Sequence, residues 1–151
     1  MLENFVSNEN NSQKINSENL RKNVEEIFQI MGENLTDSKI ATDALILADL
    51  RGVESHGISN MLRIYIEGYR NEEIKPQAKL STIKDNHATC SVDGDRGLGI
   101  ITTPKAMDIA IAKAKTYGIS MVTIKNSRHL GMASYHAIQA MKHKMIGMCV
   151  T

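Results

Sequence analysis

The sequence predicts an α/β protein, in which an N-terminal helical segment precedes a mixed sheet covered by helices. Two patterns along the chain support this fold class. Up to Pro76 the apolar residues recur at the three- and four-residue spacing of amphipathic helices, and from about residue 79 they alternate in short runs typical of strands. We therefore expect a flexible arm (1–16), a helical segment (17–76) and the first part of an α/β domain (77–151).

The helical segment should contain three helices, preceded by an arm rich in Asn, Ser and Glu that has no periodic apolar positions. Ser17 is the expected N-cap of the first helix and Gly32 marks its end. The second helix should run from Thr36 or Asp37 to about residue 51, just before a glycine. The third is predicted from one apolar stripe, which consists of Ile58, Met61, Leu62, Tyr65, Ile66 and Tyr69.

Strands and helices should alternate in the remainder of the chain. Strands are expected at 79–84 and 88–92, on either side of a polar turn. Thr103 and Pro104 are typical of a helix cap and first turn, and this helix should end near Tyr117. A strand (119–124), a helix (about 132–143) and another strand then follow in the order of a β-α-β unit.

The last predicted strand starts near Ile146. In it Ile146, Met148 and Val150 alternate with other residues, so we expect them to point into the core. The pattern reaches Thr151 without a turn residue to end the strand, and we therefore expect the chain to be truncated.

The composition disfavours several classes of partner. With 18 basic and 17 acidic side chains the net charge is +1, and only 4% of residues are aromatic, which argues against a nucleic-acid-binding surface. No apolar run approaches the roughly 20 residues that span a bilayer, and the polar N-terminus does not resemble a signal peptide. We expect a cytoplasmic protein without a nucleic-acid or membrane partner, in which Cys90 and Cys149 are free thiols.

One candidate site is the bend at 51–57, with the sequence RGVESHG, between two amphipathic helices. Ser55 and His56 beside an arginine are suited to orient a carboxylate and to move a proton. The alternative is a helix C-cap followed by an N-cap, with His56 merely polar, and spacing alone favours that alternative.

Another candidate site is the loop 125–131, with the sequence KNSRHLG, which lies between a predicted strand and a predicted helix. Ligands of α/β proteins commonly bind at such places, and free N–H groups at a helix start favour a neutral imidazole at His129. The alternative is an ordinary polar loop in which His129 caps the helix or faces solvent. The residues alone do not decide between these interpretations.

The sequence gives little support for a Rossmann dinucleotide site or for a metal site. The glycines at 94–99 follow the order GxxGxG, which is not the GxGxxG order of a Rossmann dinucleotide site, so we reject that assignment. His136 and His143 are about 10 Å apart along one predicted helix, too far to share a metal ion, and the sequence has neither an HExxH motif nor a cysteine cluster. No metal site is predicted.

Taken together, four segments resemble the malate/L-lactate dehydrogenase family, an NAD(P)-dependent family without a Rossmann fold. Its relatives include ureidoglycolate, sulfolactate and diketogulonate oxidoreductases. The matching segments lie in consistent order within residues 17–151, and they are ADLRGVESHG (48–57), VDGDRGLG (92–99), KNSRHLGMA (125–133) and MIGMCVT (145–151). Four segments together are more specific than any one of them, and they favour the functional interpretation of both loops.

The resemblance implies an oxidoreductase that transfers a hydride between NAD or NADP and a small 2-hydroxy acid or 2-keto acid. It implies a homodimer of longer subunits, with residues 77–151 forming the first part of the catalytic and cofactor-binding domain and with most cofactor contacts beyond Thr151. His129 would accept the proton of the substrate hydroxyl, although His56 matches the other histidine to which a proton role is given. The alternative is an inactive remnant, or a dimerisation or binding module of the same family.

The resemblance also implies substrate-binding residues, namely Ser55, Asn126 and Ser127. The sequence departs from the family at Asn60, where many relatives have an arginine that holds the substrate carboxylate. Arg63 lies about one helical turn further on, and we expect it to take that role from the same face of the helix.

Overall fold

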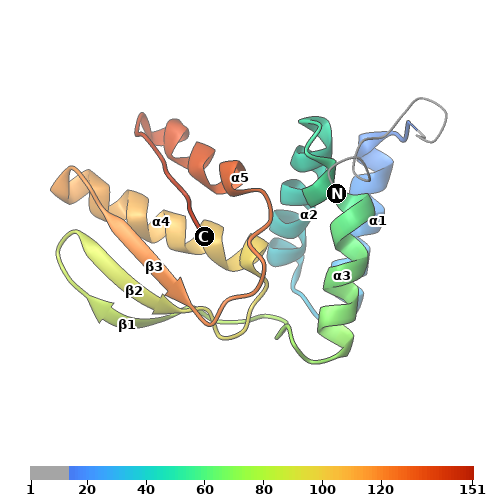
Figure 1. The fold of residues 1–151 in the computed structure, drawn as a ribbon, viewed down its shortest axis with the longest axis horizontal. Coiled ribbons are helices and arrows are strands. Elements are labelled where there is room, and N and C mark those ends of the chain that lie inside the picture. The colour runs from blue at the N-terminus through green and yellow to red at the C-terminus, as the bar shows by residue number, and fades with distance from the viewer. Residues whose placement is uncertain (1–13) are drawn as a thin grey trace.

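The computed structural model describes residues 14–151, and it places a helical part beside an α/β part (Figure 1). The helical part contains α1 (Ser17–Ile30), α2 (Leu35–Leu50), the short 3-10 helix η2 (Glu54–His56) and α3 (Ile58–Arg70). Except for residues 14–16, the predicted arm lies outside the described residues. The three predicted helices are therefore confirmed in number, order and approximate length.

Asparagines cap the first two helices. The Asn16 side chain accepts hydrogen bonds from the N–H groups of Glu18 and Asn19, so the cap of α1 is one residue before the predicted Ser17. The Asn34 side chain accepts from the N–H of Asp37, which places the start of α2 slightly before the predicted position. Both caps satisfy N–H groups that have no partner within the helix.

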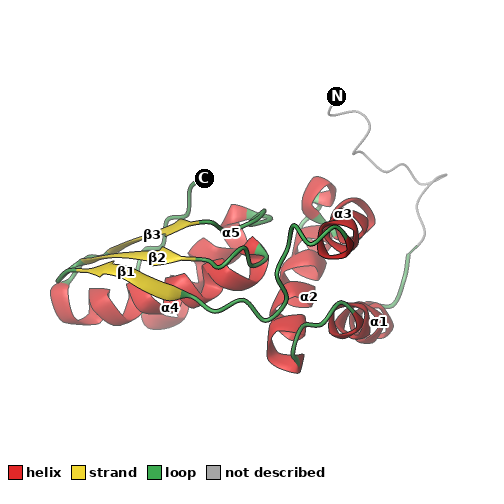
Figure 2. Ribbon diagram, turned by 90° about the horizontal axis from the view of Figure 1, so that it is seen from below, coloured by secondary structure: helices red, strands yellow, loops and turns green. Residues whose placement is uncertain are grey.

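The sheet has three strands in the order β1 (Ser81–Asp85), β2 (Thr89–Asp93) and β3 (Met121–Lys125). β1 and β2 are antiparallel, whereas β2 and β3 are parallel and are joined through α4 (Gly99–Tyr117). In Figure 2, α4 lies along one face of the sheet. Cys90 and Val92 of β2 pack there against Ala106 of α4, which confirms an α/β arrangement with a mixed sheet.

The start of α4 differs from the prediction. The helix begins at Gly99, so Pro104 lies in its second turn instead of its first. The turn before Pro104 is buried, and it includes Ile100 and Ile101. Burying each of these side chains contributes about 1.5–3 kcal/mol, which offsets the roughly 3 kcal/mol that an interior proline costs.

The C-terminal region also differs. The predicted helix at 132–143 is present as α5 (Ala133–Ala137), which continues as the 3-10 helix η3 (Ile138–His143). The predicted strand from Ile146 is wrong, because within the described residues the segment 145–151 pairs with no other strand. Ile146, Met148 and Val150 do alternate, but they point outward and are 102%, 76% and 79% exposed. An apolar alternation predicts a buried strand only if another element covers it.

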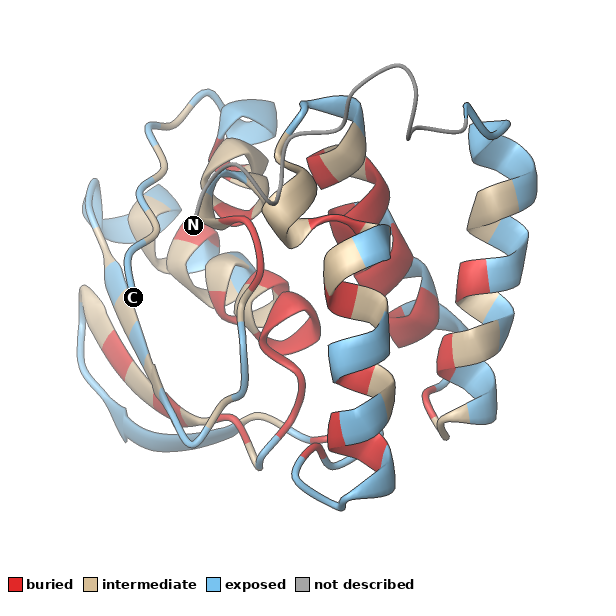
Figure 3. Ribbon diagram, turned by 45° about the vertical axis from the view of Figure 1, so that its right-hand side comes forward, coloured by how far each residue is buried: buried red, intermediate tan, exposed pale blue. Residues whose placement is uncertain are grey.

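The helical part has its own core, and Figure 3 shows the buried residues on the sides of the helices that face one another. Phe28 of α1, Leu45 of α2 and Tyr65 of α3 are each 1% exposed. Ile100 and Ile101 of α4 belong to the same cluster. The first turn of α4 is thus attached to the helical part, whereas the rest of the helix covers the sheet.

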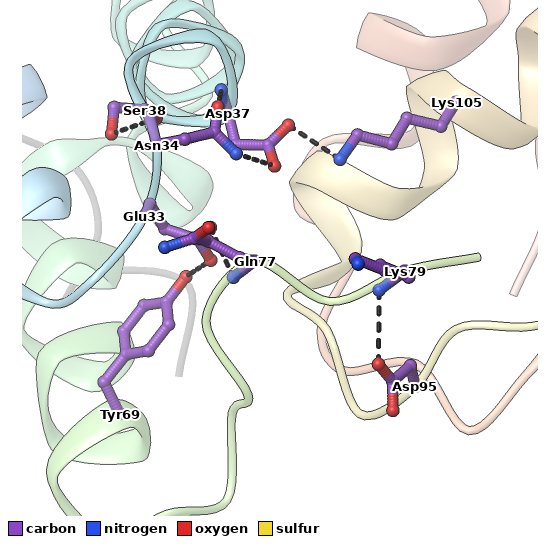
Figure 4. Close-up of polar contacts among 9 residues, drawn as sticks. All are labelled: Glu33, Asn34, Asp37, Ser38, Tyr69, Gln77, Lys79, Asp95 and Lys105. Atoms are coloured by element: carbon purple, nitrogen blue, oxygen red, sulfur yellow. Dashed lines mark hydrogen bonds and ion pairs between the residues drawn. The ribbon is translucent and has the colours of Figure 1, made fainter.

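A buried polar network also joins the two parts (Figure 4). Tyr69 donates to Oε1 of Glu33 at 2.6 Å, and the backbone N–H of Gln77 donates to Oε2 at 2.9 Å. Burial raises the pKa of Glu33, although both hydrogen bonds oppose this shift. Close by, Lys105 of α4 forms an ion pair of 2.7 Å with Asp37 of α2. These contacts fix the turn between α1 and α2 against α3 and α4.

Within residues 14–151, no helix is both long enough and apolar enough to cross a membrane.

Candidate active site

His56 lies in a bend whose backbone is held from α2. Asp49 of α2 accepts a hydrogen bond of 3.0 Å from the N–H of Ile58, the first residue of α3. Gly57 allows this approach, because a Cβ atom at that position would overlap the Asp49 carboxylate. Asn60 donates to the carbonyl of Glu54 at 2.8 Å and closes the bend from the other side. Asp49, Gly57 and Asn60 thus hold the backbone of the bend that carries His56.

His129 lies in the loop after β3, and the glycine-containing loop 94–99 supports this loop. Gly94 N–H donates to Lys125 O at 2.8 Å, Arg96 N–H donates to Asn126 O at 2.8 Å, and Arg128 N–H donates to Gly97 O at 2.9 Å. A Cβ atom at Gly99 would lie 2.6 Å from both the carbonyl carbon and the oxygen of His129. The loop 94–99 thus holds the backbone of the His129 loop in place through these hydrogen bonds and through close packing at Gly99.

Three residues in these two loops have a strained backbone. Asp95, Arg96 and Asn126 adopt φ values of 53°, 57° and 54°, a left-handed region in which residues other than glycine are uncommon. Each such residue costs about 1 kcal/mol or more and persists only where its surroundings hold it, which occurs most often near functional sites.

The two histidines meet although they come from separate parts of the fold. The ring centroids of His56 and His129 are 5.5 Å apart, with the planes inclined by 20°. Each ring has its Nδ1 atom in contact with a hydroxyl group. Ser55 Oγ lies 2.9 Å from Nδ1 of His56, and the Tyr65 hydroxyl lies 2.9 Å from Nδ1 of His129. In each ring, therefore, the hydroxyl group contacts Nδ1 and not Nε2.

Electrostatics favour a neutral His129. Partial burial lowers the pKa of His129, and the neighbouring His56 lowers it further. Both effects disfavour the imidazolium, because burial removes water from a charged ring and a second positive charge repels it. A histidine that is neutral near pH 7 is able to accept a proton, which is the property that a general base requires.

The structure brings together only some of the residues that the sequence predicts for the site. Ser55, His56 and His129 converge. Arg63 is exposed on α3, and because two positions along a helix are about 200° apart it lies on nearly the opposite side from the buried Tyr65.

Asn126 and Ser127 make their contacts within the supporting loops. Asn126 donates to Asp93 Oδ1 at 2.9 Å, and Ser127 Oγ lies 2.8 Å from Thr102 Oγ1. These geometries do not test the substrate-binding roles of Asn126, Ser127 and Arg63, which stay predictions.

The sequence interpretation missed three residues of the site, which are Tyr65, Asp49 and Gly99. In the sequence Tyr65 is part of an apolar stripe, but a buried tyrosine hydroxyl usually requires a hydrogen-bond partner, and this requirement is the signal that points to it. Asp49 and Gly99 lie within the segments 48–57 and 92–99 that resemble the family, but their roles depend on backbone groups that approach from elsewhere in the chain.

Three N–H groups of the loop 94–99 are not available to bind a dinucleotide phosphate. A phosphate site needs free N–H groups, and those of Gly94, Arg96 and Gly97 are already bonded to carbonyl oxygens of Lys125, Asn126 and Gly94. Within residues 14–151, no cluster of three or more His, Cys, Asp or Glu side chains is arranged to hold a metal ion.

Comparison with known proteins identifies the family. A model of the family described as malate/L-lactate dehydrogenase matches residues 15–151. The chain belongs to this family. The resemblance predicted from the four sequence segments is therefore confirmed.

Individual members of the malate/L-lactate dehydrogenase family are similar in sequence and in fold. The chain is 37% identical over 134 residues to the L-sulfolactate dehydrogenase of Methanocaldococcus jannaschii, which covers 89% of this chain and 39% of that protein. It is 40% identical over 121 residues to the malate dehydrogenase of Pyrococcus abyssi, with 80% and 33% covered. The malate dehydrogenase structure from Pyrococcus horikoshii OT3 superposes with a TM-score of 0.88 at 34% identity, covering 93% of this chain and 40% of that one. The chain thus spans about 40% or less of the length of these relatives.

Proposed function

We propose that His56 and His129 form the acid–base part of an oxidoreductase that transfers a hydride between NAD or NADP and a small 2-hydroxy acid or 2-keto acid. The observation that carries this proposal is the convergence of the two imidazoles, each with Nδ1 held by a hydroxyl group. The names of the relatives support the substrate class, because malate and sulfolactate are both 2-hydroxy acids.

In the direction of oxidation, the hydroxyl O–H bond of the substrate breaks and its proton passes to neutral His129. The electron pair of that O–H bond forms the second bond of the new carbonyl group, while the C–H bond on the same carbon breaks and its electron pair leaves with the hydrogen as hydride. When bound, NAD or NADP supplies the nicotinamide that accepts the hydride. The 2-keto acid leaves, and His129 then releases its proton to solvent. In the reverse direction the imidazolium of His129 protonates the developing alkoxide.

We assign the other residues of the site to substrate binding. Ser55 adjoins His56 and is suited to hydrogen-bond the substrate, and we propose that Asn126 and Ser127 contribute from the other loop. We propose Arg63 for the substrate carboxylate, because a cation that bound this group would align the reacting carbon. By extension from the resemblance, the protein would act as a cytoplasmic homodimer, with most of its cofactor contacts outside this chain.

The test is to follow the absorbance of NADH and NADPH with a panel of 2-keto acids. This chain and the longest product of its gene are assayed in parallel. His129→Ala should lower turnover by about 10²–10⁴-fold, the usual contribution of a general acid–base group. His87→Ala, at an exposed position in the turn between β1 and β2, is the matched control and should leave turnover unchanged.

Normal turnover in the His129→Ala protein would refute the assignment of that residue. Absence of activity from both wild-type proteins, with the longer one well folded, would instead favour the alternative of an inactive or binding module.

A further inference from the structure

We propose that Tyr65 is a positioning residue, which accepts a hydrogen bond from Nδ1–H of His129 and thereby makes Nε2 the nitrogen that exchanges the proton. The Tyr65 hydroxyl lies 2.9 Å from Nδ1 of His129, and the two rings are tilted with centroids 6.0 Å apart. This inference deepens the proposed function and rests on it, since it specifies which atom of His129 reacts.

Tyr65 is packed in the protein core, whereas His129 is not. Tyr65 is 1% exposed in the middle of α3 and packs in the core of the helical part, whereas His129 lies in a loop and is exposed. Gly131 allows the loop to pass over this core, because its φ of 72° is left-handed and a Cβ atom there would lie 2.6 Å from Ile100 Cγ2. The orientation of the His129 ring is therefore set by a residue whose own side chain is fixed by packing.

The direction of the hydrogen bond follows from the chemistry of a base. A neutral imidazole carries one proton, and to accept another at Nε2 it must carry that proton on Nδ1. Nδ1–H then donates, and the Tyr65 oxygen accepts. Because Nδ1 is the nitrogen that contacts the Tyr65 hydroxyl, Nε2 is the one left to exchange a proton with the substrate. The Nδ1 proton stays in place throughout the reaction, and only Nε2 gains and loses one.

A tyrosine hydroxyl beside Nδ1 affects the pKa of His129 differently from a carboxylate. Burial raises the pKa of Tyr65 well above its ordinary value, so the hydroxyl stays protonated and uncharged. A carboxylate would favour the imidazolium and raise the pKa of the histidine. A neutral hydroxyl instead selects the tautomer without adding charge, and His129 is left as a base that is neutral near pH 7.

The structure offers a closely matched pair of variants. Tyr65→Phe removes the hydroxyl and keeps the ring that fills the core. Tyr69→Phe, one turn further along α3, also removes a buried hydroxyl, but that hydroxyl donates to Glu33 and not to His129. A general loss of stability should appear in both variants, whereas a change in the His129 tautomer should appear only in Tyr65→Phe.

The first measurement is the tautomer of His129 in this chain, read from long-range ¹H–¹⁵N correlation spectra of the imidazole nitrogens at a pH above its pKa. We expect Nδ1–H in the wild type and in Tyr69→Phe, and a shift toward Nε2–H in Tyr65→Phe. An Nε2–H tautomer in the wild type would overturn the proposal, because Tyr65 would then be the donor. An unchanged tautomer in Tyr65→Phe would also overturn it.

The second measurement is turnover with a 2-keto acid, in whichever of the two proteins assayed above is active. Tyr65→Phe should lower kcat by about 10- to 100-fold, less than loss of the base itself, with little change in KM. If His129→Ala is inactive while Tyr65→Phe matches Tyr69→Phe, the role of Tyr65 is refuted and the proposed function stands. If His129→Ala is fully active, the assignment of His129 as the acid–base group fails whatever its tautomer, and the role of Tyr65 fails with it.

Discussion

His56 and His129 stack ring against ring, with centroids 5.5 Å apart and planes inclined by 20°. One ring comes from the bend between α2 and α3, and the other comes from the loop that follows β3. A positive charge on His56 at this distance repels one on His129, so His56 lowers the pKa of His129.

Removal of the His56 charge should raise the pKa of His129. In His56→Gln the repulsion is lost while a polar side chain of similar length remains, so the His129 imidazolium becomes easier to form. NMR titration of the His129 ring in this chain measures the change, which should diminish at high salt. The exposed His87→Gln variant serves as the control, and an unchanged or lowered His129 pKa in His56→Gln would contradict the coupling.

Gly99→Ala should displace the His129 loop. A methyl group there meets the His129 carbonyl at 2.6 Å, and because the obstacle is backbone it cannot rotate away. We expect the free energy of unfolding to fall by about 1–3 kcal/mol, as in other overpacked sites. Urea unfolding and the NMR resonances of His129 are the measurements.

Gly118→Ala provides the comparison for Gly99→Ala. Gly118 has a φ of 82° and no atom within 4 Å of an added Cβ, so the substitution costs about 1–2 kcal/mol through the backbone alone. It should leave the His129 resonances in place. Equal effects of both substitutions on those resonances would show that the glycine loop does not position His129.

Glu33→Ala should destabilise the protein strongly. It leaves the Tyr69 hydroxyl and the Gln77 N–H without their acceptor, and the expected loss is about 2–4 kcal/mol in the free energy of unfolding. Glu26 is exposed on α1, so Glu26→Ala should stay within about 0.5 kcal/mol of the wild type. Urea denaturation of the two variants makes the comparison, and similar midpoints would mean that the buried network contributes little.

His136 should make the protein less stable at mildly acidic pH. It is fully buried, its Nε2 lies 2.7 Å from Leu130 O, and burial lowers its pKa although the Leu130 hydrogen bond opposes the shift. The unfolded chain takes up this proton near pH 6.5 and the folded chain only at lower pH. The free energy of unfolding therefore falls as the pH drops from about 6.5 to the folded pKa, with a slope of at most about 1.4 kcal/mol per pH unit.

His136→Gln tests this slope, because a glutamine amide keeps a donor for Leu130 O but does not titrate. Urea unfolding of wild type, His136→Gln and the exposed-site variant His87→Gln should be measured across the same pH range. Only His136→Gln is expected to flatten the slope below about pH 6.5. A slope as steep as that of the wild type would exclude His136 as its source.

The sequence alone determined the helices of the N-terminal part, the order of the sheet elements and the family. These features are encoded locally: amphipathic spacing specifies a helix, alternation specifies a strand, and a motif such as ESHG remains in one stretch of chain. Even the errors in the helix caps were small, because the capping side chain and the N–H group that it binds are close in sequence.

Only the tertiary structure decided how the site is built. The contact of Tyr65 with His129, the stacking of His56 on His129 and the support of the His129 loop by Gly99 each join distant segments. The spacing of apolar residues along the sequence does not predict such a contact, because the contact depends on how separate elements pack. The same reason explains why the start of α4 and the strand expected from Ile146 were predicted incorrectly. Burial by distant residues outweighed a proline in one case. In the other, the apolar alternation pairs with no strand within residues 14–151.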